Sequence, residues 1–198
     1  MQGSRKPLAK VEGRRSLRQS GLTIAWRGTP DLRREGSGNL GATNVARVAG
    51  AGAGALVALL DIGKGAAGVL LAERLTGADV ATAAAAGLAA VVGHVYPIGL
   101  RFRGGKGVAT ACGAFAMLAP LALVAAVVMF LAGAALTRYV SVGSLAAALT
   151  LPIAGYATGA PTPVEIAAVA TSLLVIARHR SNAARLWSGT ERRLGARA

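Results

Sequence analysis

Cysteine, histidine and aromatic side chains are all scarce in this chain of 198 residues. The one cysteine, Cys112, excludes an internal disulfide, and with only two histidines beside it the sequence offers no convincing metal site. Aromatic residues make up 4% of the chain, whereas nucleic-acid binders usually interleave their cations with aromatic rings. We therefore expect no metal, no cofactor and no nucleic-acid partner.

Hydrophobic residues, by contrast, account for 54% of the chain, and only 15% of it is charged. This balance is typical of a multispanning membrane protein rather than a soluble domain. The apolar runs consist mainly of alanine, leucine, valine and glycine, and such small residues let helices pack closely. The sequence therefore predicts an all-α fold, a multipass transmembrane helical bundle.

Apolar runs predict the membrane-spanning helices at residues 51–75, 78–99, 107–136, 140–158 and 162–177. The run at 107–136 is too long for one crossing, because a helix of that length would measure about 45 Å against a hydrocarbon layer of roughly 30 Å. Bending it at Pro120 gives about six crossings. The basic segments around Arg47, Lys106 and Arg138 and the basic tail from residue 178 then share one face. The positive-inside rule makes that face cytoplasmic.

A glycine-rich cationic turn, GHVYPIGLRFRGGKGVAT at residues 93–110, lies between two of these runs. Gly104, Gly105 and Gly107 would let the backbone approach a ligand closely, and a helix that begins after the turn would aim its free N–H groups at the same point. Two interpretations stay open from these residues alone: a phosphate site, or a loop whose charges only fix orientation. A nucleotide P-loop is excluded, because Gly107 rather than Ser or Thr follows Lys106.

The same face collects cations, hydroxyls and amides from distant parts of the sequence, with few carboxylates. This mixture is typical of a phosphate site. Ionisable groups in or beside a span are functional candidates, because burying them is costly unless they are paired. Asp61 and Lys64 lie three positions apart on one helix and can pair.

Longer strings carry a more specific indication: SGNLGATNVARVAG at 37–50, DIGKG at 61–65, the turn at 93–110, RYVSVGS at 138–144 and RHRSNAARLWSGTE at 178–191. In this order and spacing they resemble the motifs of the bacterial PlsY glycerol-3-phosphate acyltransferases, over roughly residues 31–194. The resemblance implies a multipass enzyme of the bacterial inner membrane with its active site on the cytoplasmic face. It would move a fatty acyl group from acyl-phosphate to the 1-hydroxyl of sn-glycerol 3-phosphate, giving lysophosphatidic acid and phosphate, the first step of phospholipid biosynthesis. Neither a metal nor a cofactor is implied.

The resemblance also implies roles for individual residues. Catalytic or substrate-orienting roles fall on Ser144, His179 and Asn182. The residues implied to bind substrate or phosphate, or to shape their pocket, are Ser37, Asn39, Thr43, Asn44, Arg47, Lys64, Gly104, Gly105, Lys106, Gly107 and Thr110. In the family, a phosphate oxygen of the donor is thought to help deprotonate the acceptor hydroxyl, so no strong protein base is required.

The N-terminal segment departs from the family pattern. Residues 1–30 are basic and polar where the family normally begins with an apolar span. We therefore expect six crossings instead of the family's seven, with a disordered or interfacial tail at 1–30 ahead of an acyltransferase domain at 31–198. The alternative to an enzyme is a membrane transporter or channel for an organic phosphate. A transporter needs a polar path to the opposite face, which has few ionisable groups, among them Arg74, Asp79 and Glu165, so a one-sided enzyme site is favoured.

Overall fold

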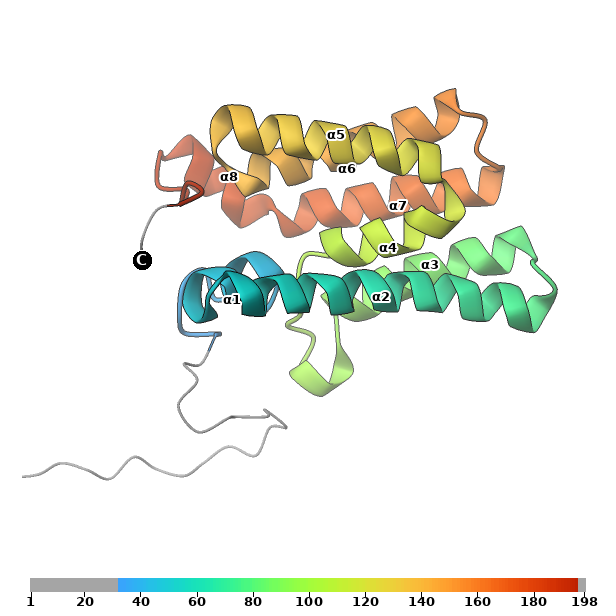
Figure 1. Cartoon of the computed structure of the whole chain (residues 1–198), viewed down its shortest axis with the longest axis horizontal. Coiled ribbons are helices and arrows are strands. Elements are labelled where there is room, and N and C mark those ends of the chain that lie inside the picture. The colour runs from blue at the N-terminus through green and yellow to red at the C-terminus, as the bar shows by residue number, and fades with distance from the viewer. Residues whose placement is uncertain (1–31, 196–198) are drawn as a thin grey trace, which may run out of the picture.

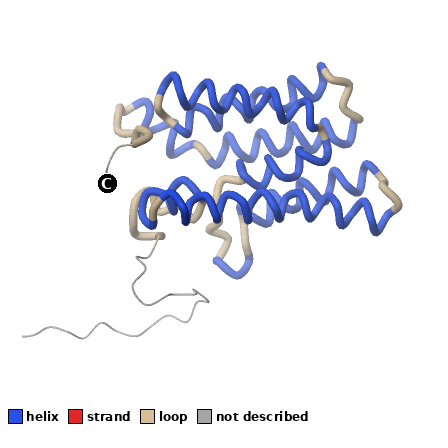
Figure 2. The backbone as a smooth tube through the Cα atoms, viewed as in Figure 1, coloured by secondary structure: helices blue, strands red, loops and turns tan. Residues whose placement is uncertain are grey.

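The computed structural model describes residues 32–195, and over that range it is built from helices without any strand (Figures 1 and 2). The α-helices are α1 Ala42–Ala49, α2 Ala51–Thr76, α3 Val80–Val95, α4 Val108–Leu118, α5 Pro120–Thr137, α6 Val140–Ala157, α7 Thr162–Arg178 and α8 Arg180–Trp187, with a 3-10 helix η1 at Ile98–Leu100. The predicted all-α bundle is confirmed. The tail predicted at 1–30 lies outside the described residues.

The long apolar run is divided where the sequence predicts. Helix α4 ends at Leu118, and α5 begins at Pro120, whose missing N–H costs nothing at the first position of a helix. Within residues 32–195, four helical stretches are long and apolar enough to cross a membrane: Ala51–Thr76, Val80–Leu100, Pro120–Thr137 and Val140–Ala157. Helices α4 and α7 have 11 and 17 residues, so the count of six crossings stays a prediction.

The connections between helices lie in two groups, one at each end of the bundle (Figure 1). The α2–α3, α4–α5 and α6–α7 connections lie at one end. Helices α1 and α8 lie at the other, together with the start of α2, the α5–α6 turn and the end of α7. The up-and-down course of the helices therefore brings together the helix ends and turns that carry predicted polar motifs.

Glycine brings the backbones of α2 and α4 into contact. A Cβ atom on Gly65 of α2 would overlap the carbonyl oxygen of Thr110, and one on Gly113 of α4 would overlap the carbonyl oxygen of Ile62. Such small-residue contacts are the usual way in which membrane helices approach closely. They fix where α4 begins, and with it the position of the glycine-rich turn.

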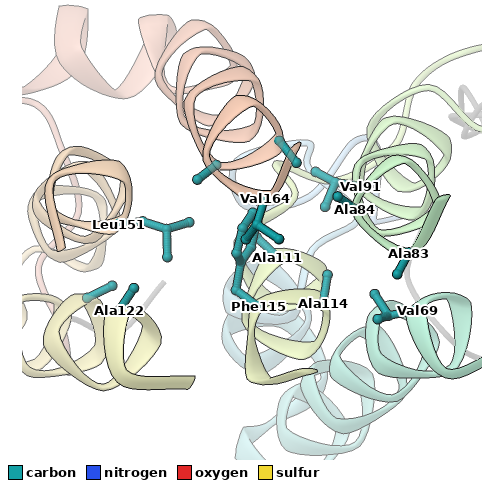
Figure 3. Close-up of a cluster of buried hydrophobic side chains, with 13 residues drawn as sticks. Val69, Ala83, Ala84, Val91, Ala111, Ala114, Phe115, Ala122, Leu151 and Val164 are labelled. Carbon is teal, nitrogen blue, oxygen red and sulfur yellow. The ribbon is translucent and has the colours of Figure 1, made fainter. Parts of the chain in front are cut away.

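Small side chains also fill the core between the helices (Figure 3). Phe115 of α4 is the largest fully buried side chain, and Val69 of α2, Val91 of α3 and Val164 of α7 belong to the same buried cluster. Helix α4 therefore lies between α2, α3 and α7. Its N-terminus is held from several sides, which makes it a rigid support for a binding site.

Candidate active site

A cavity of about 380 Å³ lies among α1, α2, α4, α5, α6, α7 and α8, and the end of α3 also contributes to its lining. Its polar part is lined by residues of α1, the start of α4 and the C-terminal segment, including Arg47, Lys106 and His179. Its other part is apolar and lies between α5 and α6, with Phe130 and Leu151 among its lining residues. One cavity therefore offers both cations and a surface suited to an acyl chain.

Most of the predicted site residues line this cavity: Ser37, Asn39, Thr43, Asn44, Arg47, Lys106, Gly107, Ser144, His179 and Asn182. They come from α1, α6 and α8, from the loops before α1 and α4, and from the junction between α7 and α8. The structure therefore brings together side chains that are more than 140 positions apart in the sequence.

Lys64 and Thr110 are predicted to contact substrate but do not line the cavity. Thr110 is fully buried where α4 meets Gly65 of α2, and its hydroxyl has no partner among the described residues. Lys64 instead bonds to Asp61 and His94, two side chains that themselves line the cavity. Thr110 faces the contact between α4 and α2, whereas the Lys64 side chain is 43% exposed and lies outside the cavity.

The glycine-rich turn requires a second correction. The N–H groups of Gly104 and Gly105 donate to the carbonyls of Val95 (3.1 Å) and His94 (3.3 Å), so they do not face a ligand as predicted. Carbonyls at the end of α3 lack helical partners and take these donors instead. Gly107, with a left-handed φ of 87°, caps the N-terminus of α4 and lines the cavity together with Val108 and Ala109.

The loop before α1 is organised by Asn44. Its side-chain oxygen accepts from the N–H of Ser37 (2.7 Å), and its amide donates to the carbonyls of Leu32 and Glu35 (3.2 Å each). Asn44 therefore holds Ser37 at the edge of the cavity. The Asn39 side chain accepts from the N–H of Gly41 (2.7 Å), which shapes the entry into α1.

A chain of hydrogen bonds links Lys106 to the C-terminal segment. The Lys106 ammonium donates to the side-chain oxygen of Asn182, whose amide donates to Glu191 (2.6 Å). The Glu191 carboxylate also accepts from Ser141 (2.9 Å) and Arg185 (2.7 Å). Burial would raise the pKa of Glu191, but these hydrogen bonds outweigh it and keep the pKa below its usual value.

Lys106 itself lies in a partly desolvated, cationic environment. Burial lowers its pKa to about 8; Glu191 opposes this shift, while Arg185, Arg47 and Arg178 add to it. The group remains mostly protonated at neutral pH. An anion that enters the cavity would stabilise the protonated Lys106, because the anion offsets the repulsion between Lys106 and the neighbouring arginines.

His179 is 2% exposed and is held in one tautomer. Its Nδ1 lies 2.8 Å from the carbonyl oxygen of Val175, which only accepts, so Nδ1 carries the proton and Nε2 has a free lone pair. Burial and the nearby charge of Lys106 lower the pKa of His179 to about 4. The ring is neutral at physiological pH and serves as a hydrogen-bond acceptor. Ser144, also at the cavity, donates to the carbonyl of Val140 (2.9 Å).

The C-terminal segment is fastened across the α5–α6 turn. The N–H of Leu194 donates to the carbonyl of Arg138 (2.7 Å), and the Arg138 side chain donates to the carbonyl of Leu194 (3.1 Å). Arg193 stacks over the ring of Tyr139. These contacts hold Glu191, three residues before Leu194, in its place beside Asn182.

A second pocket of about 230 Å³ adjoins the first and shares Ser37 and Asn39 with it. Its other lining residues include Arg33, Arg103 and Arg178. Arg178 stacks on the ring of Tyr96, and its buried Nε has no partner among the described residues. The polar mouth therefore has two cationic lobes, one with and one without an apolar extension.

Glu191, Asp61 and His94 line the cavity but are missing from the predicted site. Glu191 had a visible signal: it is the only acidic residue after Glu165, in a segment rich in arginine. An isolated acid among cations is a sign of a specific pairing role. The sequence indicates a pairing of Asp61 with Lys64, but the contact of this pair with His94 depends on the packing of α2 against α3.

Comparison with known proteins shows the family of the chain. The family model described as glycerol-3-phosphate acyltransferase matches residues 16–189. A glycerol-3-phosphate acyltransferase of Syntrophotalea carbinolica is 46% identical over 169 residues, covering 85% of this chain and 86% of the relative. That of Anaeromyxobacter dehalogenans is 48% identical over 168 residues, covering 83% and 84%.

Solved structures are similar over the same extent. A crystal structure of PlsY, an integral membrane glycerol 3-phosphate acyltransferase, in its glycerol 3-phosphate form superposes with a TM-score of 0.80 at 40% identity, covering 84% of this chain and 83% of that one. The lysophosphatidic acid form of PlsY gives a TM-score of 0.76 at 40% identity, covering 80% and 81%. The chain described here belongs to the PlsY family of integral membrane glycerol-3-phosphate acyltransferases.

Proposed function

We propose that this acyltransferase uses acyl-phosphate as its donor and forms lysophosphatidic acid and inorganic phosphate. The 1-hydroxyl oxygen of sn-glycerol 3-phosphate attacks the acyl carbon, and the bond from that carbon to the phosphate oxygen breaks. The hydroxyl proton leaves with the phosphate. No other co-reactant is needed for the balance.

The observation that carries this proposal is the joining of a cationic mouth and an apolar branch in one cavity. An acyl-phosphate has the same two parts, a charged head and a hydrocarbon tail. Arg47 and Lys106 would contact the phosphate, and the first N–H groups of α4 would add donors with a favourable dipole. The tail would lie along Phe130 and Leu151 between α5 and α6.

Electrostatic stabilisation of the departing phosphate is the main catalytic contribution in this proposal. Charge develops on the phosphate oxygens as the acyl–oxygen bond breaks, so Lys106 and Arg47 bind the transition state more tightly than the substrate. The neutral Nε2 of His179 would orient the attacking hydroxyl by accepting its hydrogen bond. With a pKa of about 4, His179 is too weak a base to remove the proton alone, which agrees with a proton that passes to the donor phosphate.

Two phosphate-bearing substrates must be held together during the reaction. The second pocket, with Arg33, Arg103 and Arg178, supports this requirement, because it supplies further cations next to Ser37 and Asn39. Holding both molecules at one site supplies the proximity that a bimolecular transfer needs. We assign the site to the cytoplasmic face of a bacterial inner membrane, since its cations share one end of the bundle.

The donor is tested by offering the purified protein, in detergent with glycerol 3-phosphate, three donors of equal chain length: acyl-phosphate, acyl-coenzyme A and acyl carrier protein. Mass spectrometry of the lipid product gives the rate for each. The proposal expects lysophosphatidic acid from acyl-phosphate alone. Equal or faster transfer from acyl-coenzyme A would overturn it.

A further inference from the structure

Asp61, Lys64 and His94 form a polar cluster beside the glycine-rich turn, and the reaction proposed above gives none of the three a role. The Lys64 ammonium lies 2.6 Å from Asp61 Oδ1 and 2.5 Å from His94 Nδ1, and the His94 and Asp61 side chains are only 10% and 11% exposed. The Lys64 side chain is 43% exposed, but burial of the other two polar groups in a membrane bundle is costly unless they are paired. The three groups pair with one another, which offsets the cost of burial. This pairing does not explain why the cluster lies beside the glycine-rich turn.

The cluster fixes the orientation of the His94 ring. Its Nδ1 lies 2.5 Å from the Lys64 ammonium and 3.3 Å from Asp61 Oδ1. Asp61 in turn holds Lys64 in place. The ring is therefore aimed by two residues of α2, although it belongs to α3.

The aimed ring lies against Gly105. A Cβ atom on Gly105 would overlap Nε2 and Cε1 of His94, so the ring occupies the place of the missing side chain. The backbone adds to this contact, because the His94 carbonyl accepts the N–H of Gly105 at 3.3 Å. Lys106 is the next residue, and its ammonium reaches the cavity.

We propose that His94 is a positioning residue for Lys106, and that Asp61 and Lys64 hold the His94 ring in the orientation that supports the turn. Removing the ring leaves a gap beneath Gly105 into which the turn relaxes, and Lys106 moves with it. A displacement of about 1 Å at a reacting group costs up to roughly a hundredfold in rate. This inference rests on the proposed function only in that Lys106 binds phosphate.

The overlap between His94 and Gly105 gives a double-mutant test. Gly105→Ala alone should lower kcat/KM by at least about tenfold, since its methyl group collides with the ring. In the His94→Ala background the same change should cost little, because the space is free. Gly93→Ala, whose methyl group meets no other atom, is the matched control and should leave activity unchanged. Losses that simply multiply would overturn the proposal.

Binding of inorganic phosphate, measured by calorimetry without any donor, separates positioning from folding. The proposal expects His94→Ala to bind phosphate at least about tenfold more weakly while its melting temperature in detergent stays near that of the wild type. Wild-type phosphate affinity in His94→Ala would overturn it. If that variant does not fold, Asp61→Asn combined with Lys64→Met takes its place. This double variant removes both charges and leaves the orientation of the His94 ring unsupported. Its phosphate affinity is measured in the same way, with the same expected result.

The two proposals fail in different ways. If the wild-type protein neither binds phosphate nor uses acyl-phosphate, the proposed function is wrong. If it does both and the His94 and Gly105 effects are independent, only the positioning role is wrong.

Discussion

Replacing Lys106 by methionine should remove nearly all transfer activity and leave the bundle folded. Its ammonium lines the cavity at the start of α4 and is held there by Asn182. Loss of one pre-organised donor to the developing charge costs roughly 10²–10³ in kcat, or about 2.7–4 kcal/mol. Methionine keeps the length and the apolar packing of the lysine side chain without its charge, so the melting temperature in detergent should change little.

The same residue predicts a pH dependence. Lys106 binds phosphate when protonated, and burial lowers its pKa to about 8. Activity that depends on the protonated form is present below this pKa and is lost as the pH rises through it. The value of kcat/KM, which reports the free enzyme, should therefore be level near pH 7 and fall about tenfold for each pH unit well above 8.

The effect of Lys106→Met and the pH dependence are both measured as phosphate release from synthetic acyl-phosphate in the presence of glycerol 3-phosphate, corrected for spontaneous hydrolysis at each pH. Arg74→Gln, at the opposite end of the bundle, is the control for loss of a cation and should be fully active. Activity of Lys106→Met within threefold of the wild type, or a profile that stays level to pH 10, would refute the assignment of Lys106.

Three further substitutions test other parts of the structure. Glu191→Gln removes a carboxylate that accepts from Ser141, Asn182 and Arg185, so it should lower the unfolding free energy by about 1.5–3 kcal/mol and reduce kcat; unchanged melting in detergent would contradict this. Gly65→Val should separate α2 from α4 and lower the melting temperature, whereas Gly63→Ala, where a methyl group meets no other atom, should not. Ala147→Phe narrows the apolar branch and should lower kcat/KM for a sixteen-carbon donor relative to an eight-carbon one; an unchanged ratio would place the acyl chain elsewhere.

The helices could be predicted from the sequence because apolar runs and their breaks carry most of the information. The run at 51–75 corresponds to α2, Ala51–Thr76, and the bend at Pro120 separates α4 from α5. Proline and glycine mark these ends for local reasons that do not depend on distant contacts. The short helix η1, Ile98–Leu100, was not separable from its neighbours by composition alone.

The site could be predicted only in part, because its details depend on contacts between distant segments. Arg47, Lys106 and His179 carry charge or hydrogen-bonding groups next to apolar runs, which made them visible in the sequence. The N–H groups of Gly104 and Gly105 were expected to face a ligand, but the end of α3 lies close enough to take them. Likewise, the burial of Thr110 follows from the contact of α4 with α2, which no local pattern reveals.

The most direct test of the central claim is the initial rate of phosphate release from synthetic acyl-phosphate by the purified wild-type protein, with and without glycerol 3-phosphate. The account predicts release that depends on glycerol 3-phosphate and is matched one for one by lysophosphatidic acid. Folded protein that releases no phosphate with both substrates present, or that releases it at the same rate without glycerol 3-phosphate, would contradict the account.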